Sequence, residues 1–342
     1  MWWRWYEYRT GGNRLDWINR RWQPMDLVRH KQLRRDLELL LELRPLAYVL
    51  DEAWFMNRKY ALRGAVLIPR PETEELVAWV LDRENENRRL QVLDVGCGSG
   101  AIACSIGLER PNWKVRGMDI DLSALSVARL NARKLHAPVR IHQVDMRAER
   151  WPSWDVVVCN PPYIGQGMEH TLSPGVAKYE PHLALFAPQA DPLYYYRVLA
   201  NQLRKVIDTS RLIKKRAVAI RRGFMAGDEP REPDQRQPFC KVMYMEMPSD
   251  CAASIRDLFG AWDTEMRCDA QGVARMLRVS SEFRASEVLF VNFGARGRLH
   301  PDGAVGFFNQ SRQYCARTHF QTGRNSIRKH MVKRLRPANR AC

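Results

Sequence analysis

Four consecutive residues, Asn160 to Tyr163 (N-P-P-Y), bring together groups that could hold a substrate. They follow the run D-V-V-V-C at 155–159, whose continuous apolar character is typical of a strand buried on both faces of a parallel sheet. Proline has no backbone N–H to donate to a ladder, which predicts that the strand ends at Asn160. Ligands of open α/β sheets bind at the carboxyl ends of the strands, so we expect the motif to line a binding site.

The groups of this motif suit a planar ligand that carries N–H donors. The Asn160 carboxamide and the Pro161 carbonyl can each accept one hydrogen from an amide or amino nitrogen, and the ring of Tyr163 can cover the flat face. Pro162 keeps the turn rigid. A nitrogen held in this way can direct its lone pair at an electrophile. An isolated N-P-P-Y is equally compatible with a Pro-rich turn at the end of a strand.

A second candidate site is the stretch D-V-G-C-G-S-G at 94–100. Gly96, Gly98 and Gly100 allow a tight turn and the close approach of a ligand to the backbone. The next predicted strand ends at Asp119, about 20 residues after the glycines, where a carboxylate could bind ribose hydroxyls. Together these features predict a nucleotide-type site.

The spacing of the glycines separates this site from a dinucleotide site. It is G-x-G-x-G rather than G-x-G-x-x-G, and Asp94 precedes the glycines. A carboxylate near the turn suits a cationic ligand, such as the α-amino group of S-adenosylmethionine. A further predicted strand ends at Asp145 and Met146. We therefore expect the glycine turn, Asp119, Met146 and Asn160 to line one crevice.

Predicted strands and helices alternate along this region. Apolar runs predict strands that begin at Gln91 and that cover 114–118, 139–144 and 156–159, with helices at 101–108 and 122–135 between them. This order predicts a doubly wound, Rossmann-like parallel sheet with right-handed crossovers. Upstream, helical spacing predicts an amphipathic helix within 25–43, and alternation predicts a hairpin around Asn57 and Arg58.

These patterns divide the chain of 342 residues into four parts. The predicted parts are a basic N-terminus with a helical domain (1–44), a hairpin linker (45–68), the main α/β domain (69–279, with an exposed insertion at about 205–240) and a basic tail (280–342).

The positive charge predicts an anionic partner such as RNA. The formal net charge is +17, and the tail contributes +9 from 12 Lys and Arg against 3 Asp and Glu. The tail lacks a sustained hydrophobic period. We interpret it as a disordered segment that could contact the ribosome or RNA, or as an extension without a role.

Several sequence features bear on location and assembly. The first 23 residues contain five Arg but only Glu7 and Asp16 as acids, which predicts a mitochondrial presequence as one possibility, with a cytoplasmic location as the other. No run approaches the roughly 20 apolar residues of a membrane span. Eight scattered cysteines lack zinc-site spacing, so we expect free thiols and no metal. We also expect a monomer.

The motifs taken together resemble the HemK/PrmC family. The resemblance is carried by R-P-E-T-E at 70–74, D-V-G-C-G-S-G at 94–100, Asp119, N-P-P-Y-I at 160–164, P-L-A-Y-V-L at 45–50, Y-E-P-H-L-A-L-F at 179–186 and L-Y-Y-Y-R at 193–197. It is close from about Arg44 to Arg197 and weaker at 244–247 and around Asp269, Gly272 and Arg275. Members of this family are S-adenosylmethionine-dependent methyltransferases that modify the glutamine of the Gly-Gly-Gln loop in peptide-chain release factors.

The resemblance implies a class I methyltransferase fold, S-adenosylmethionine as cofactor and a class 1 release factor as partner. It implies cofactor contacts by Asp94, Gly96, Cys97, Gly98, Ser99, Gly100, Asp119, Asp145, Met146 and Asn160. It also implies that the substrate glutamine is held by Asn160, Pro161, Pro162 and Tyr163, with Asn160, Pro161 and Tyr163 as catalytic residues. The family commonly has Trp or another aromatic residue where Met146 stands, which weakens the assignment of Met146.

Two other functions fit the residues. The exocyclic amino groups of nucleic-acid bases have the same planar N–H geometry as an amide, so the protein could methylate a base. It could also be a noncatalytic RNA-binding protein on a methyltransferase fold, although the complete set of glycines, Asp119 and N-P-P-Y argues against this alternative.

Overall fold

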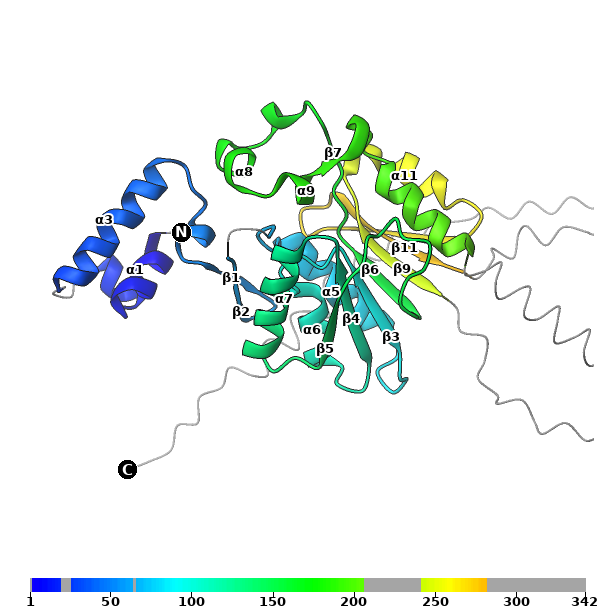
Figure 1. Ribbon diagram of the computed structural model, residues 1–342, viewed down its shortest axis with the longest axis horizontal. Coiled ribbons are helices and arrows are strands. Elements are labelled where there is room, and N and C mark those ends of the chain that lie inside the picture. The colour runs from blue at the N-terminus through cyan, green and yellow to red at the C-terminus, as the bar shows by residue number, and fades with distance from the viewer. Residues whose placement is uncertain (1, 20–25, 64–65, 206–240, 282–342) are drawn as a thin grey trace, which may run out of the picture. The chain divides into compact units, whose positions relative to one another are not determined.

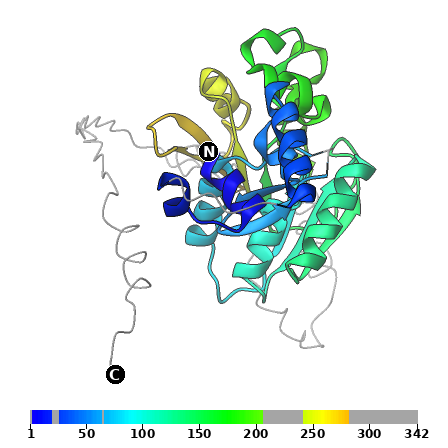
Figure 2. The same ribbon diagram turned by 90° about the vertical axis from the view of Figure 1, so that its left-hand side faces the viewer.

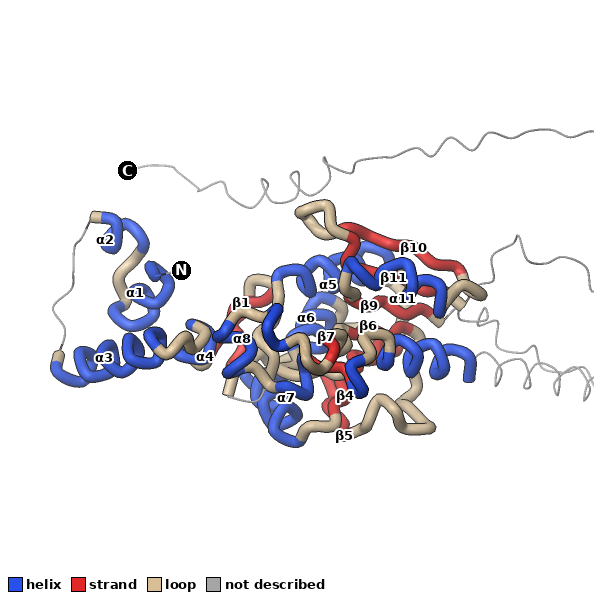
Figure 3. Tube along the Cα trace, turned by 90° about the horizontal axis from the view of Figure 1, so that it is seen from above, coloured by secondary structure: helices blue, strands red, loops and turns tan. Residues whose placement is uncertain are grey.

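A seven-stranded sheet is the centre of the computed structural model, which describes residues 2–19, 26–63, 66–205 and 241–281. The strands follow the order β10-β11-β9-β6-β3-β4-β5, and Figure 3 shows β10 and β5 at the two edges. They are β3 (Gln91–Val95), β4 (Lys114–Asp119), β5 (Val139–Gln143), β6 (Val156–Cys159), β9 (Val242–Glu246), β10 (Asp263–Cys268) and β11 (Ala274–Ser280). Neighbouring strands are parallel except at β11, which is antiparallel to both β9 and β10.

The doubly wound, Rossmann-like sheet predicted from the sequence is confirmed. All four strands that the apolar runs predicted are present as β3 to β6. The chain winds outward from β3 to β4 and β5, and then returns to the other side of β3 with β6 and continues to β9. The winding direction therefore reverses between β3 and β6, and loops that diverge at such a point leave a crevice at the carboxyl ends of the strands.

Helices cover both faces of the sheet (Figure 1). One layer contains α5 (Pro71–Arg83), α6 (Ala101–Glu109) and α7 (Leu122–Lys134), and the other contains α11 (Ala252–Leu258) and a helix over 194–205. Val156 and Val158 pack with the first layer, whereas Val157 and Cys159 pack with the second. Burial on both sides explains why β6 is apolar at every position.

The N-terminal region is helical, as predicted, but its predicted apolar face is only partly buried, with Leu33 packed against Trp5 and Tyr6. Its helices are α1 (Trp2–Thr10), α2 (Arg14–Ile18), α3 (Leu27–Leu41) and α4 (Leu46–Val49). Leu27, Val28 and Leu41 are exposed, while the buried residue of α3 is Asp36. The side of α3 that faces α1 also carries Asp36, whose carboxylate accepts hydrogen bonds from Trp5 Nε1 (2.9 Å) and from Arg9 (2.5 and 3.0 Å).

The predicted hairpin is also present, one residue earlier than expected. It consists of β1 (Glu52–Phe55) and β2 (Arg58–Ala61), which pair antiparallel. The turn is Met56-Asn57 rather than Asn57-Arg58, and both turn residues have positive φ (48° and 59°). A two-residue turn with positive φ at both positions matches the right-handed twist of the two strands.

A segment of short elements follows β6 and leads to the helix over 194–205. It contains β7 (Ile164–Gly165), η1 (Glu169–Thr171), α8 (Pro174–Tyr179), α9 (His182–Leu185), β8 (Phe186–Ala187) and η2 (Pro188–Ala190). Parallel pairing of β7 with β8 ties the start of this segment to its end. Figures 1 and 2 show it in green at one end of the sheet.

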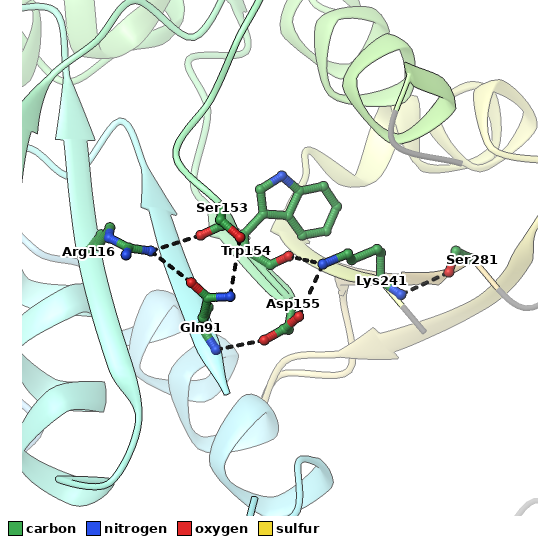
Figure 4. A network of polar contacts seen from close by, with 7 residues as sticks. All are labelled: Gln91, Arg116, Ser153, Trp154, Asp155, Lys241 and Ser281. Atoms are coloured by element: carbon green, nitrogen blue, oxygen red, sulfur yellow. Dashed lines mark hydrogen bonds and ion pairs between the residues drawn. The ribbon is translucent and has the colours of Figure 1, made fainter. Parts of the chain in front are cut away.

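A polar network joins the strands at the opposite end of the sheet (Figure 4). The Asp155 carboxylate accepts hydrogen bonds from Gln91 N (2.9 Å) and Lys241 Nζ (3.0 Å). Ser281 bonds to Lys241 through its main chain and side chain (2.8 Å each). The strand β11 ends at Ser280, next to this network. The predicted boundary between the main domain and the tail, after Val279, therefore falls inside the strand.

Most of the predicted insertion (206–240) and of the predicted tail (282–342) lies outside the described residues. Within the described ranges, no helix is long and apolar enough to cross a membrane. The same ranges contain no cluster of His, Cys, Asp and Glu side chains that could hold a metal ion. The five cysteines at described positions are free thiols.

Candidate functional site

The two motifs that the sequence singled out end neighbouring strands. The glycine turn follows β3, N-P-P-Y follows β6, and Val95 at the end of β3 pairs with Cys159 at the end of β6. Gly96 and Asn160 therefore begin the two loops at the point where the winding of the sheet reverses. The structure thus brings the two motifs to the same end of neighbouring strands, where ligands of open α/β sheets bind.

The glycine turn leaves its first two glycines open to a ligand. Gly96 and Gly98 have φ of +72° and +52°, and a Cβ added at either position would meet no atom within 4 Å. Gly100 has another role, because a Cβ there would lie 3.2 Å from the Cα of Ala128 on α7. The first two glycines allow a ligand to approach the backbone, and the third allows two helices to pack.

Asp119 lies beside this turn and supports it. Its Oδ2 accepts a hydrogen bond from Gly98 N (2.9 Å), and its Oδ1 accepts one from Asp121 N (3.0 Å). Burial raises the pKa of the carboxyl above its usual range, although these two backbone bonds act in the opposite direction. A carboxylate offers about four lone-pair positions, so Asp119 retains acceptor capacity for the hydroxyls of a ribose.

Asp94, two residues before Gly96, is buried at the end of β3. Its side chain is fully buried, and Oδ2 accepts a hydrogen bond from Ala103 N (3.0 Å) in the first turn of α6. Burial raises the pKa of this carboxyl to about 8. Its other oxygen, Oδ1, is buried and bonds to no group in the described part of the chain, and a contact of Asp94 with a cationic ligand stays a prediction.

The remaining residues of the turn offer their backbone rather than their side chains. Cys97 and Ser99 are buried, and burial raises the pKa of the Cys97 thiol. Asn131 of α7, which the sequence analysis did not single out, donates from Nδ2 to Ser99 O (2.9 Å) and accepts from Ala61 N at Oδ1 (2.7 Å). This residue connects the hairpin to the glycine turn.

Asp145 and Met146 lie just beyond β5, which pairs with β4 and ends opposite Asp119. The Asp145 carboxylate is held by Arg147 at 2.6 to 3.0 Å, and this hydrogen bonding lowers the pKa of Asp145. Met146 is partly buried in the apolar cluster of the second face, and its carbonyl accepts a hydrogen bond from Trp151 Nε1 (3.0 Å). An aromatic side chain thus stands close to the position where the family commonly has one.

In N-P-P-Y, two hydrogen-bond acceptors remain available. Asn160 donates from Nδ2 to Thr73 Oγ1 (3.1 Å), while its Oδ1 and the Pro161 carbonyl bond to no group in the described part of the chain. Pro161 is buried and Pro162 is partly buried. Tyr163 packs against the apolar cluster of the second face, and burial raises its pKa to about 12. The motif can therefore accept two N–H hydrogens beside an aromatic ring.

The R-P-E-T-E-E segment at 70–75, part of which carries the resemblance to the family, connects distant parts of the chain. Thr73 contacts Asn160 and also donates from Oγ1 to Glu246 Oε2 (2.6 Å). Arg70 pairs with the buried carboxylate of Glu180 at 2.6 Å. The other two contacts run from Met56 N to Glu74 Oε1 (2.9 Å) and from Ala270 N to Glu75 Oε1 (3.2 Å).

Glu246, Thr73 and Glu180 were missed as site residues by the sequence analysis. A signal was present in two of them, because Glu246 interrupts the apolar run of β9 and Glu180 lies within Y-E-P-H. Both side chains are almost fully buried, and buried carboxylates are rare unless they have partners. The sequence could not reveal those partners.

The open turn at Gly96 and Gly98, the free acceptor capacity of Asp119 and the unused acceptors of N-P-P-Y fit an adenosine-containing cofactor and an adjacent planar amide. The predicted cofactor residues follow the carboxyl ends of β3, β4, β5 and β6, and their contacts with a cofactor stay a prediction.

Known proteins resemble this chain across the same region. The family model described as "Methyltransferase small domain" matches residues 74–174. The release factor glutamine methyltransferase of Lactococcus lactis subsp. lactis is 37% identical over 207 residues, which cover 58% of this chain and 74% of that protein. The protein of the same name from Neisseria gonorrhoeae is 46% identical over 162 residues, 46% of this chain and 57% of its own length.

A solved structure of the human METTL16 catalytic domain with an RNA hairpin is 14% identical, with a TM-score of 0.43, and covers 64% of this chain and 74% of that one. A likeness at this level carries no information about the substrate. The close relatives, together with the glycine turn, Asp119 and N-P-P-Y at one crevice, place the chain in a family: it belongs to the release factor glutamine methyltransferases.

Proposed function

We propose that this protein transfers a methyl group from S-adenosylmethionine to the N5 nitrogen of a glutamine in the Gly-Gly-Gln loop of a class 1 peptide-chain release factor. The observation that carries the proposal is the pair of unused acceptors, Asn160 Oδ1 and the Pro161 carbonyl, next to the open glycine turn. The two acceptors match the two hydrogens of a primary amide. The names of the bacterial relatives support the choice of substrate.

The protein contributes position and exclusion of water rather than a nucleophile. The cofactor supplies an already activated methyl group when it is bound. The backbone at Gly96 and Gly98 and the Asp119 carboxylate hold it, while Asn160 and Pro161 hold the amide. Accurate positioning of two reactants can contribute about 7 to 11 kcal/mol to lowering a barrier.

An amide nitrogen is a poor nucleophile because its lone pair is delocalised into the carbonyl. Acceptance of both N–H hydrogens by Asn160 and Pro161 fixes the plane of the amide and favours a nitrogen with more lone-pair character. When the C–N bond forms, the bond between the methyl carbon and sulfur breaks, S-adenosylhomocysteine is the other product, and the nitrogen releases one hydrogen as a proton to solvent. The ring of Tyr163 covers the flat face of the amide, and its high pKa keeps the hydroxyl neutral at physiological pH. These residues therefore act on the nitrogen that receives the methyl group.

The compartment and the further partners are also proposals. The relatives reported above are bacterial and give no support for a mitochondrial location. We also propose that the protein is a monomer and that residues 280–342 contact the ribosome or RNA. Most of that segment lies outside the described residues.

The test is transfer of isotope-labelled methyl groups to a purified release factor, followed by mass spectrometry of the Gly-Gly-Gln peptide. A release factor with Gln→Ala in the loop is the control, and total RNA is offered in parallel. We expect label on the loop glutamine of the normal release factor only. Label on RNA alone would favour methylation of a base, and cofactor binding without transfer to either would favour a noncatalytic protein.

A further inference from the structure

Three side chains from distant parts of the chain form a line that ends at the substrate site. Glu246 at the end of β9 accepts a hydrogen bond from Thr73, and Thr73 accepts one from Asn160. The contacts join residues that are 173 and 87 positions apart in the sequence. Glu246 and Thr73 are buried, whereas Asn160 is partly exposed, so the line runs from the interior to the crevice.

The direction of these hydrogen bonds follows from the number of protons. Thr73 has one hydroxyl proton, and its oxygen lies 2.6 Å from Glu246 Oε2. This separation is within the range of about 2.5 to 2.7 Å for a hydroxyl that donates to a carboxylate. The Thr73 hydroxyl therefore donates its only hydrogen bond to Glu246. In its contact with Asn160, the Thr73 oxygen can only accept.

That contact decides the orientation of the Asn160 carboxamide. An oxygen that can only accept selects the NH₂ end of the amide, which lies 3.1 Å away as Nδ2. The Oδ1 end must then point away from Thr73. The two ends of an amide have nearly the same shape, so hydrogen bonding rather than packing sets which end faces the crevice.

We propose that Thr73 and Glu246 are positioning residues for methyl transfer, and that their hydrogen bonds keep Asn160 Oδ1 facing the substrate. A reversed amide would present NH₂ donors to the donors of the target amide and would not hold it. The inference rests on the proposed function, because it describes how the same site keeps its acceptor in place. Neither residue touches the substrate.

The first test replaces Thr73 by a residue of the same shape. Thr73→Val removes the hydroxyl and should lower turnover by roughly 10- to 100-fold. A small misplacement of the target amide, caused by a misoriented Asn160, lowers the rate of transfer by factors of this size. The affinity for S-adenosylmethionine, measured by calorimetry, should change by less than about twofold. Thr73→Ser keeps the hydroxyl and should restore most of the turnover.

A double-mutant cycle separates positioning from a general structural effect. If Thr73 acts through Asn160, the change Thr73→Val should have almost no further effect on turnover in an Asn160→Ala background, since coupled residues are not additive. Ser105→Ala is the matched control, because it removes another buried hydroxyl, bonded to Tyr60 Oη at 2.8 Å outside the site. We expect this variant to retain wild-type turnover.

Two outcomes would overturn the inference. One is wild-type turnover in Thr73→Val, and the other is an equal loss from Thr73→Val with and without Asn160. If Thr73→Val does not fold, Thr73→Ala provides the same comparison without an apolar group against Glu246. The wild-type assay separates this failure from failure of the proposed function, because absence of loop methylation by the unmodified protein rejects the function itself.

Discussion

At the scale of single residues, the site depends on groups that remain free to bind as much as on groups that are bonded. Asp119 accepts two backbone hydrogen bonds and still has acceptor capacity, and Asn160 uses its NH₂ end while its Oδ1 stays available. Asp94 is the contrary case, since it is fully buried at the end of β3. Exposure and hydrogen bonding thus separate residues that the sequence had grouped together.

The role of Asp119 can be tested by cofactor affinity. Asp119→Ala removes an acceptor for ribose hydroxyls and also the bond to Gly98 N, so binding of S-adenosylmethionine should weaken by more than about tenfold. Calorimetry measures this change, and the thermal midpoint of the variant shows whether it is folded. A folded variant with unchanged affinity would remove Asp119 from the site.

The ionisation of Glu246 predicts a pH dependence of turnover. Burial is the main cause that raises the pKa of Glu246, from 4.5 to about 7. The ionised carboxylate accepts the hydrogen bond from the Thr73 hydroxyl, and protonation of Glu246 removes this requirement on the direction of the bond. Turnover should therefore fall as the pH decreases through about 7. The hydrogen bond from Thr73 and the charges of Arg275 and Arg70 lower this pKa, and the charge of Glu72 raises it. Tyr163, Cys159 and Tyr196 also face Glu246, and the Tyr196 hydroxyl donates to Glu246 O.

Stability should respond to this group in the opposite sense. An acid whose pKa is higher in the folded state contributes stability below its unfolded pKa of 4.5, and that contribution is lost as the pH rises through about 7. Loss of turnover on the acid side is therefore not explained by unfolding through Glu246. The measurement is the pH profile of turnover for wild type and Glu246→Gln. We expect the variant to lose the step near pH 7, and an unchanged step would assign it to another group, such as Asp94.

At the scale of elements, α1 is attached to the fold by a buried ion pair. Asp36 on α3 is almost inaccessible, and Arg9, which is partly exposed, contacts both of its oxygens and also the carbonyl of Val49. Trp5 and Gln32 donate two further hydrogen bonds to the same carboxylate. The helix α3 is thus held through a polar contact, while several of its leucines remain exposed.

Removal of Arg9 should therefore be costly. Arg9→Ala leaves the Asp36 carboxylate buried without its cation, and loss of one partner of a buried pair typically costs about 3 to 5 kcal/mol. Urea unfolding measures the change in free energy. Arg34→Ala, on the helix α3 that carries Asp36, is the matched control. The ion pair of Arg34 with Glu38 is exposed and should contribute less than about 1 kcal/mol to stability. Equal effects of the two changes would contradict a structural role for α1.

At the scale of the whole molecule, the candidate site and the polar network of Figure 4 occupy opposite ends of the sheet. The glycine turn and N-P-P-Y follow the carboxyl ends of β3 and β6, whereas Asp155 and Lys241 precede β6 and β9. Ser281, the last described residue, bonds to Lys241 in this network. The described chain therefore ends away from the site.

This arrangement predicts that the tail can be removed without loss of the site. Truncation after Ser281 should preserve the thermal midpoint and cofactor affinity, while it reduces salt-dependent association with RNA or ribosomes, because the positive charge of residues 280–342 is largely lost. Truncation after Val279 is the comparison. It removes the Ser281 bonds to Lys241 and the last residue of β11, so it should lower the thermal midpoint. A truncation after Ser281 that unfolds the protein would contradict the prediction.

Local patterns in the sequence were sufficient to predict four of the seven strands, β3 to β6, and the two motifs, whereas β9, β10 and the antiparallel β11 were not predicted. The apolar runs of β3 to β6, the helical spacing between them and the prolines after Asn160 are properties of neighbouring residues, which the chain imposes before it folds. Strand ends marked by glycine and proline then predicted the crevice. The hairpin turn was displaced by one residue, since alternation defines strands better than it defines the residues between them.

Tertiary structure decided how the site is supported. The contact of Thr73 with Glu246 spans 173 residues, that of Arg70 with Glu180 spans 110, and that of Asn131 with Ala61 spans 70. No local pattern contains such pairs, because each side chain gains its partner only when the sheet and its helices have packed. Burial of Asp94 and exposure of the α3 leucines have the same origin: the identity of a residue sets what it can bond, and only the packed chain sets what it meets.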